Sequence, residues 1–179
     1  GARQYSIALL SVLSNDESDN HYYVLHNTHD SQVLEITNGK QNMTLIPVKS
    51  GKEKKYQKLL RHFINYWNII SGKLHHSFRA KNYYYLNSLC TKYKIDIVHF
   101  PAQYNPLIKR ARKICTIHDV QELHFPDYFT PEERRDRAVD AVERIKIADL
   151  IVVSYKHVKN DLIRYFKVPE NKILVCLLD

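Results

Sequence analysis

Two histidines and an aspartate stand out because each lies at the end of a short apolar run. His99 lies near the end of Ile95–Phe100, and His118 and Asp119 come directly after Lys113–Ile117. Both runs are rich in β-branched residues, which is typical of buried strands in a parallel sheet. In open α/β sheets, ligands bind beyond the carboxyl ends of the strands. The sequence therefore predicts that these three side chains lie where such a fold binds its ligands.

The residues alone leave the role of each side chain open. Asp119 could cap a turn, and His118 could be a buried histidine whose hydrogen bonds are satisfied. His99 could equally be a core histidine bonded to the backbone. The chain shows no paired carboxylates of the kind a hydrolase uses and no phosphate-binding glycine loop, and its histidines and cysteines lack metal-ligand spacing. We therefore expect neither a metal site nor a bound cofactor.

The elements that would position these residues alternate along the second half of the chain. We expect the helix that starts at Pro131 to end near Lys146, and the helix Tyr155–Phe166 to begin with Ser154 as its N-cap. Two further apolar runs predict strands, Ala148–Ser154 and Lys172–Leu178. Alternating strands and helices predict an α/β fold with a Rossmann-like, doubly wound and mainly parallel sheet.

The first half is predicted to contain both helices and strands. Helical spacing of apolar residues predicts helices over Arg3–Leu13 and Lys81–Tyr93, the second packing on the strand that begins at Ile95. Alternating or apolar runs predict three strands, His21–Asn27, Val33–Thr37 and Met43–Val48. The turn signal Asn38–Gly39 follows the second of them.

Composition limits the class of protein. A chain of 179 residues, 44% of them hydrophobic, can form one domain over residues 1–179. Its net charge of +8 favours acidic partners such as phosphates, nucleic acid or an anionic membrane surface. Three cysteines in apolar surroundings suggest reduced core residues of a cytoplasmic protein, and no run is long enough to span a membrane.

The basic charge is concentrated in one segment. Lys52–Lys94 holds 10 of the 27 lysines and arginines and one acid, Glu53. Its apolar residues recur at helical spacing, and Trp67 lies among them. The segment could be a solvated helix face, or a basic and aromatic surface that lies on anionic lipid at the inner face of a membrane.

Five motifs in this order and spacing resemble the N-terminal domain of GT-B glycosyltransferases, in particular the family-4 retaining enzymes. They are D-I-V-H-F-P (96–101), T-I-H-D (116–119), H-F-P-D-Y-F (124–129), A-D-L-I-V-V-S (148–154) and V-P-E-N-K-I-L-V (168–175). The likeness covers Ile95–Val175 well, whereas Asn15–Lys94 matches only in its order of elements. The opening residues look like the family's glycine-rich loop and first helix, with Gly1 at the second glycine.

The resemblance implies roles for His118 and Asp119, and other residues of the chain are predicted to meet the acceptor. His118 would hydrogen-bond the transferred sugar near the reaction centre, and Asp119 would hold the loop or orient a neighbour. Arg3 and Tyr5 would meet an anionic group of the acceptor at the first helix N-terminus. The loop 101–106 at the cleft rim would offer further hydrogen bonds and stacking to a sugar from Gln103, Tyr104 and Asn105.

The resemblance also implies a two-domain hexosyltransferase-like enzyme of polysaccharide biosynthesis, in which this chain binds a glycan or lipid-linked acceptor. A second lobe with an E-x7-E motif would bind the nucleotide-sugar, which is a co-substrate. The chain contains no E-x7-E, and the family's first strand would precede Gly1, so we expect the chain alone to be inactive. The alternative is a non-catalytic, basic Rossmann-like module for nucleic acid or a protein partner. The basic residues of the chain cluster on one predicted helix and do not alternate with exposed aromatic residues along strands, so nucleic acid is the less favoured ligand.

Overall fold

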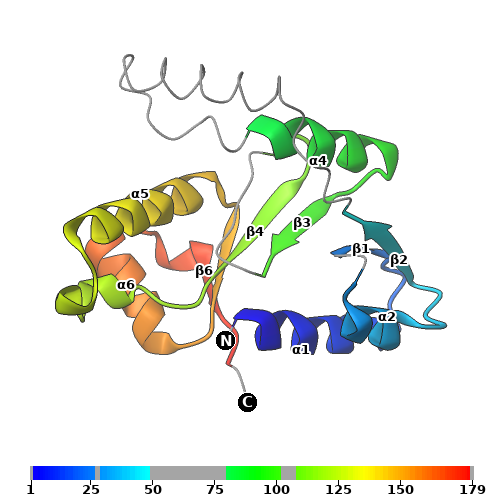
Figure 1. Cartoon of the computed structure of the whole chain (residues 1–179), viewed down its shortest axis with the longest axis horizontal. Helices are drawn as coiled ribbons and strands as arrows, with labels where there is room; N and C mark the ends of the chain where they lie inside the picture. Colours follow the sequence, from blue (N-terminus) through cyan, green and yellow to red (C-terminus); the bar gives the residue numbers. More distant parts are fainter. Residues whose placement is uncertain (1, 27–28, 49–79, 102–107, 178–179) are drawn as a thin grey trace. The chain divides into compact units, whose positions relative to one another are not determined.

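The computed structural model describes residues 2–26, 29–48, 80–101 and 108–177 (Figure 1). The chain divides into two compact units, residues 1–63 and 64–179. Both contain helices and parallel strands, so the chain is an α/β protein, as the sequence predicts. Among the residues described, no helix is both long enough and apolar enough to cross a membrane. Residues 52–79 of the basic segment, with Trp67, lie outside the described residues.

The first unit is a β–α–β arrangement preceded by a helix. Its elements are α1 (Ala2–Ser14), β1 (Tyr22–His26), α2 (Ser31–Thr37) and β2 (Met43–Pro47). The strands pair in parallel, with Tyr22 opposite Met43. The predicted first helix and the strands predicted near 21–27 and 43–48 are confirmed.

The predicted strand Val33–Thr37 is wrong, because this segment is the helix α2. Its buried residues Val33 and Thr37 are four positions apart and share one helix face. Asn38 (φ −62°, ψ 127°) and Gly39 (φ 71°) form a type II turn, closed by a 3.2 Å hydrogen bond from the Lys40 amide to the Thr37 carbonyl. The pair therefore ends a helix instead of forming a hairpin. A helix fits here because parallel strands such as β1 and β2 need a crossover connection.

The second unit contains a four-stranded, fully parallel sheet in the order β3-β4-β5-β6. Its main elements are α4 (Ala80–Lys92), β3 (Ile97–Phe100), β4 (Arg112–Ile117), α5 (Pro131–Ile147), β5 (Leu150–Val153), α6 (Lys156–Phe166) and β6 (Ile173–Val175). Short 3₁₀ turns lie at Gln121–Leu123, Pro126–Tyr128 and Glu170–Lys172. The four strands and three helices predicted here are confirmed, with ends shifted by a few residues.

The core of this unit lies on one face of the sheet. Phe100, Cys115, Ile151 and Ile173 are register partners across all four strands, so their side chains share a face. They pack in one hydrophobic cluster with α6, whose Leu162 is fully buried. Figure 1 shows α5 and α6 together beside β4–β6. At the edge of the sheet formed by β3, a second hydrophobic cluster joins α4 to β3 and to Ile95, as predicted.

The two helices after β4 and β5 begin differently. The Thr130 hydroxyl accepts from the Glu133 amide at 3.2 Å, and the Glu133 carboxylate accepts from the Thr130 amide at 2.8 Å, a complete capping box before Pro131. The prediction that Ser154 caps α6 is wrong. The N-cap is Tyr155, which makes no side-chain cap bond. Ser154 is 1% exposed, and its Oγ has no hydrogen-bond partner among the described residues.

This difference predicts opposite results for two alanine substitutions. Thr130→Ala should lower the free energy of unfolding by about 1 kcal/mol, because α5 loses its cap. Ser154→Ala should leave stability unchanged or raise it, because it removes a buried hydroxyl that has no partner in the described part of the chain. Urea denaturation of both variants beside the wild type measures the two effects. A loss of about 1 kcal/mol for Ser154→Ala would show that this hydroxyl is bonded after all.

Candidate functional site

The candidate site lies in the second unit, where the parallel strands end. Because the strands β3 to β6 all run in one direction, their carboxyl ends meet at one edge of the sheet. Pro101 follows β3, and His118 and Asp119 follow β4. The structure thus brings His118 and Asp119 to the edge that the sequence predicts, next to the exit of the neighbouring strand.

His118 connects the ends of two strands. Its Nε2 lies 2.9 Å from the carbonyl oxygen of Pro101. A carbonyl only accepts, so Nε2 carries the hydrogen and donates it, which fixes the tautomer of the neutral ring. The ring is half-buried. His118 is therefore held in one orientation at the sheet edge and keeps some exposure to solvent.

His99 lies within β3, and its side chain is on the other face of the sheet from Phe100 and the hydrophobic cluster that contains Leu162. Its Nε2 is 2.9 Å from Oγ1 of Thr116, a residue of β4 with no exposed surface. Burial holds the pKa of His99 below its usual range. The geometry therefore fits a neutral core histidine that links two strands, but its partner is a side-chain hydroxyl and not the backbone that the sequence alternative assumed.

The lowered pKa of His99 predicts a dependence of stability on pH. The unfolded side chain takes up a proton below about pH 6.5, whereas the folded one resists protonation. The stability due to neutral His99 is therefore fully present above about pH 6.5 and is lost as pH falls below it. Urea denaturation between pH 5 and 8 should show the wild type losing stability relative to His99→Gln as pH falls. A difference that is constant with pH, or that grows toward acid, would contradict this.

Asp119 belongs to a network of two carboxylates and one guanidinium. Arg137 of α5 donates from an NH2 nitrogen to Asp119 Oδ1 at 3.1 Å and from Nε to Glu122 Oε2 at 2.9 Å. The Glu122 side chain is only 6% exposed, whereas those of Arg137 and Asp119 are each 36% exposed. The guanidinium also lies over the ring of Phe129, 4.8 Å from its centroid. Arg137 therefore fixes the direction in which the chain leaves β4.

The same segment is attached to α6 by a second pair. His124 Nε2 lies 2.7 Å from Asp161 Oδ2, and the Asp161 side chain is 12% exposed. The sequence prediction missed Glu122, Arg137 and this pair. One signal was present: Arg137, Ala141 and Arg144 recur at steps of four and three, so charged residues share a helix face with a buried alanine. The partner of Asp161 has no local signal, since 37 residues separate it from His124.

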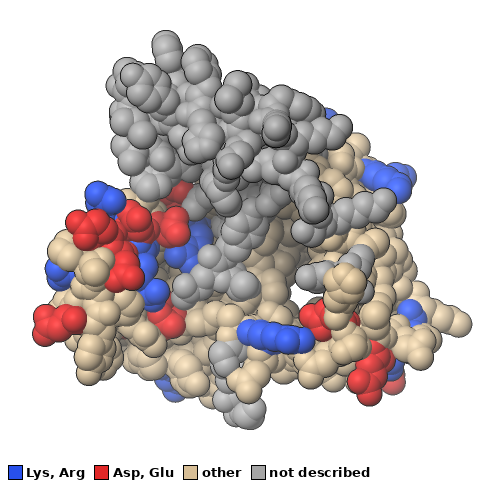
Figure 2. Space-filling view, in the orientation of Figure 1, with Lys and Arg blue, Asp and Glu red and all other residues tan. Residues whose placement is uncertain are grey.

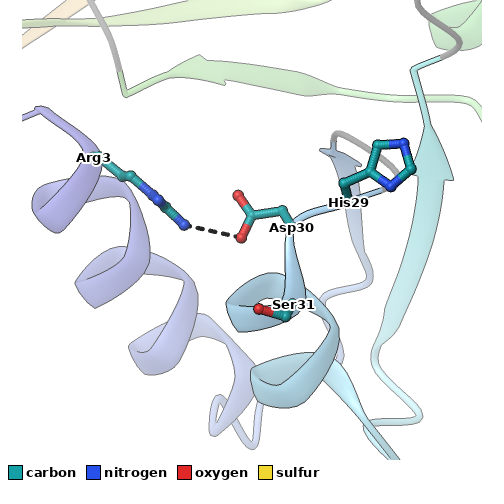
Figure 3. A pocket seen from close by; sticks show the side chains of 4 residues that line it. All are labelled: Arg3, His29, Asp30 and Ser31. Carbon is teal, nitrogen blue, oxygen red and sulfur yellow. Dashed lines mark hydrogen bonds and ion pairs between the residues drawn. The ribbon is translucent and has the colours of Figure 1, made fainter.

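In the first unit, Arg3 and Tyr5 differ in their surroundings. The Arg3 side chain is 64% exposed, and one of its terminal nitrogens lies 3.0 Å from Asp30 Oδ1 and 2.8 Å from Gln32 Oε1. Figure 3 shows Arg3 reaching from α1 toward Asp30. These two residues line a hollow of about 200 Å³ together with His29 and Ser31. Tyr5 is 6% exposed, which fits packing better than contact with a ligand. Arg3 can still meet an anion, in competition with Asp30.

The remaining predicted site residues lie outside the described residues: Gly1, Gln103, Tyr104 and Asn105. Within residues 2–26, 29–48, 80–101 and 108–177, no group of three or more histidine, cysteine, aspartate or glutamate side chains could hold a metal ion. The structure therefore places His99 within β3 and places His118 and Asp119 just past the end of the neighbouring strand β4. Arg137 joins Asp119 to Glu122.

A scan against protein-family models and a search of curated proteins found no match to this chain. Its function is therefore inferred from its residues and their geometry.

Proposed function

We propose that the chain is the acceptor-binding lobe of a retaining, hexosyltransferase-like enzyme with the GT-B fold. The whole enzyme would transfer a sugar from a nucleotide-sugar to a glycan or a lipid-linked acceptor in polysaccharide biosynthesis. In this proposal the parallel sheet of the second unit belongs to a Rossmann-like, doubly wound lobe. The nucleotide-sugar is a co-substrate bound mainly by a second lobe, and the chain itself needs no cofactor.

One observation supports this proposal most directly. The adjacent residues His118 and Asp119, which resemble the family's motif, lie together past the carboxyl end of β4 and are each held by a neighbour. The carbonyl of Pro101 orients His118, and Arg137 orients Asp119. Preorganised polar groups at such an edge are what a sugar-transfer site requires, because they cost no reorganisation during the reaction.

The roles of the residues follow from this arrangement. The acceptor hydroxyl oxygen forms a bond to the anomeric carbon of the donor sugar while the bond from that carbon to the nucleotide phosphate oxygen breaks, and the hydroxyl proton passes to the leaving phosphate. The second lobe would stabilise the charge on the leaving phosphate. His118 would contact the transferred sugar, and Asp119 would position the loop through Arg137. Arg3 would bind an anionic part of the acceptor.

The assay of this proposal uses the purified 179-residue chain. It is given several nucleotide-sugars, divalent metal and oligosaccharide acceptors, and the products are analysed by mass spectrometry. We expect no transfer, because the donor-binding lobe supplies the leaving-group stabilisation. Robust turnover by this chain would overturn the assignment as an acceptor-binding lobe.

A second candidate function, a basic module that binds nucleic acid, is favoured by the net charge of +8. Over α5, however, Figure 2 shows acidic side chains interspersed with basic ones, which is unlike the continuous basic surface that follows a phosphate backbone. We therefore keep the sugar-transfer proposal and make nucleic-acid binding an outcome of the experiments.

The proposal also places the chain in the cytoplasm, at the inner face of a membrane when the acceptor is lipid-linked. Its basis is the segment Lys52–Lys81, whose basic residues would each contribute about 1 kcal/mol near anionic lipid. We expect weak binding to anionic vesicles in co-sedimentation that disappears at high salt. Binding that ignores lipid charge, or no binding at low salt, would contradict a peripheral location.

A further inference from the structure

The loop between β4 and α5 exposes two aromatic side chains that the site described above does not use. Phe125 is 55% exposed and Tyr128 is 82% exposed. Their ring centroids are 5.9 Å apart, and the ring planes differ by only 19°. The two rings therefore form one stacked aromatic surface, which we call the aromatic platform. Solvent-exposed aromatic surface of this kind marks interaction sites more often than isolated exposed residues do.

The turn that carries the platform is closed by its own backbone. The Phe125 amide donates to the Gln121 carbonyl at 2.8 Å, and the Tyr128 amide donates to the Phe125 carbonyl at 3.1 Å. Pro126 restricts the backbone between the two rings. The platform is therefore preorganised, which lowers the entropy that a ligand loses on binding.

The platform is also tied to the elements on either side. His124, just before it, pairs with Asp161 of α6 at 2.7 Å. Phe129, just after it, lies under the guanidinium of Arg137, which also holds Asp119. One arginine thus links Phe129, the residue that follows the platform, to Asp119 of the candidate site.

The charges around the platform favour a neutral ligand. Asp127 lies between the two rings in sequence, and Glu132 and Glu133 open α5, all three exposed. Figure 2 shows acidic side chains among the basic ones over α5. Carboxylates accept hydrogen bonds from hydroxyl groups, whereas they repel phosphates and anionic lipid headgroups. A pyranose offers both hydroxyl donors and a face of C–H bonds that packs on an aromatic ring.

We infer that the aromatic platform of Phe125 and Tyr128 binds a neutral glycan chain. This inference rests on the proposed function and deepens it: the platform would hold acceptor sugars that are remote from the reacting hydroxyl. A remote contact of this kind strengthens binding of the acceptor and contributes to catalysis only through positioning.

The experiment measures equilibrium binding, so that it does not depend on sugar transfer. Neutral hexasaccharides of glucose, N-acetylglucosamine and mannose are titrated into the full chain, and binding is followed by saturation-transfer NMR and calorimetry. At least one should bind, and Phe125→Ala with Tyr128→Ala should weaken it by at least about tenfold. Tyr128→Phe keeps the ring and should stay within about twofold of the wild type. Tyr85→Ala removes another exposed tyrosine, from α4, and serves as the matched control.

Several outcomes would overturn the inference. One is the absence of binding to all neutral hexasaccharides, and another is binding that the double variant retains. Loss of binding in Tyr85→Ala as well would mean that the platform has no special part. Preference of the platform for anionic vesicles, abolished by the double variant, would assign it to a membrane instead. If the double variant binds as the wild type does while the wild type still binds glycan, only the platform fails, and the proposed function stands.

Discussion

Replacing Arg137 with alanine should lower the free energy of unfolding by about 2–3 kcal/mol. The substitution removes the cation between Asp119 and Glu122 and leaves the nearly buried Glu122 carboxylate without it. Breaking a fully buried pair in this way costs about 3–5 kcal/mol. Because the Arg137 side chain is 36% exposed, solvent compensates part of the loss. Urea denaturation monitored by circular dichroism measures the change.

Arg135→Ala is the matched control for this substitution. Arg135 lies two residues earlier in α5 and pairs with Asp136 at 3.1 Å, but the two side chains are 65% and 58% exposed. Such a surface pair contributes no more than about 1 kcal/mol. Adding Glu122→Gln to Arg137→Ala should recover part of the stability, because the amide carries no charge to leave unpaired. Equal effects of Arg137→Ala and Arg135→Ala would contradict the network.

His118→Ala should lower the rate of sugar transfer by about 100-fold in the two-lobe enzyme that the proposal requires. Removal of one preorganised polar group from a transfer site typically has an effect of about this size. The cost in stability should be about 1 kcal/mol, since the substitution removes one hydrogen bond to the Pro101 carbonyl. Steady-state kinetics and thermal unfolding of the same preparation separate the two effects.

His99→Ala provides the comparison for His118→Ala. His99 bonds to Thr116 within the sheet, so its loss should affect stability more than turnover. If His118→Ala transfers sugar at the normal rate, or if it unfolds, the catalytic role of His118 is wrong. If His99→Ala instead abolishes turnover in a folded protein, the reacting sugar lies nearer to β3 than the proposal places it.

Sequence patterns predicted the second unit well because its signals are local and strong. Apolar runs such as Leu150–Val153 are short and rich in β-branched residues, and Pro131 followed by Glu132 and Glu133 marks a helix start. Each of these elements agrees with the parallel sheet that contains it. Local preference and tertiary structure therefore point to the same answer there.

The prediction of a strand over Val33–Thr37 was wrong because the signal was ambiguous over so short a segment. Valine and isoleucine favour strands, but Val33, Ile36 and Thr37 also have helical spacing. Because β1 and β2 pair in parallel, the chain between them must form a crossover connection, and a helix is the usual one. The parallel pairing of the two strands cannot be recognised from the segment itself. Ser154 shows a similar limit of prediction from local sequence. A serine before a helix predicts an N-cap, but Ser154 is buried at the end of β5 and does not cap α6.

The position of His118 and Asp119 could be predicted, whereas their partners could not. Both residues directly follow an apolar run, which defines a strand end from sequence alone. Pro101 and Arg137 lie 17 and 18 residues away, and only the packing of β3 and α5 against β4 brings them into contact. A hydrogen bond across such a separation has no signature in a single sequence.

The central claim is that this chain binds acceptor sugars at the edge that holds His118. The most direct measurement is NMR of the chain with ¹⁵N-labelled histidine, titrated separately with neutral oligosaccharides, nucleotide-sugars and single-stranded RNA. Variants of His118 and His99 assign their ring signals. Our account predicts that an oligosaccharide shifts the His118 signals in a saturable way, with little dependence on salt, and that a nucleotide-sugar alone does not. Shifts of His118 caused only by RNA, and lost at high salt, would contradict it.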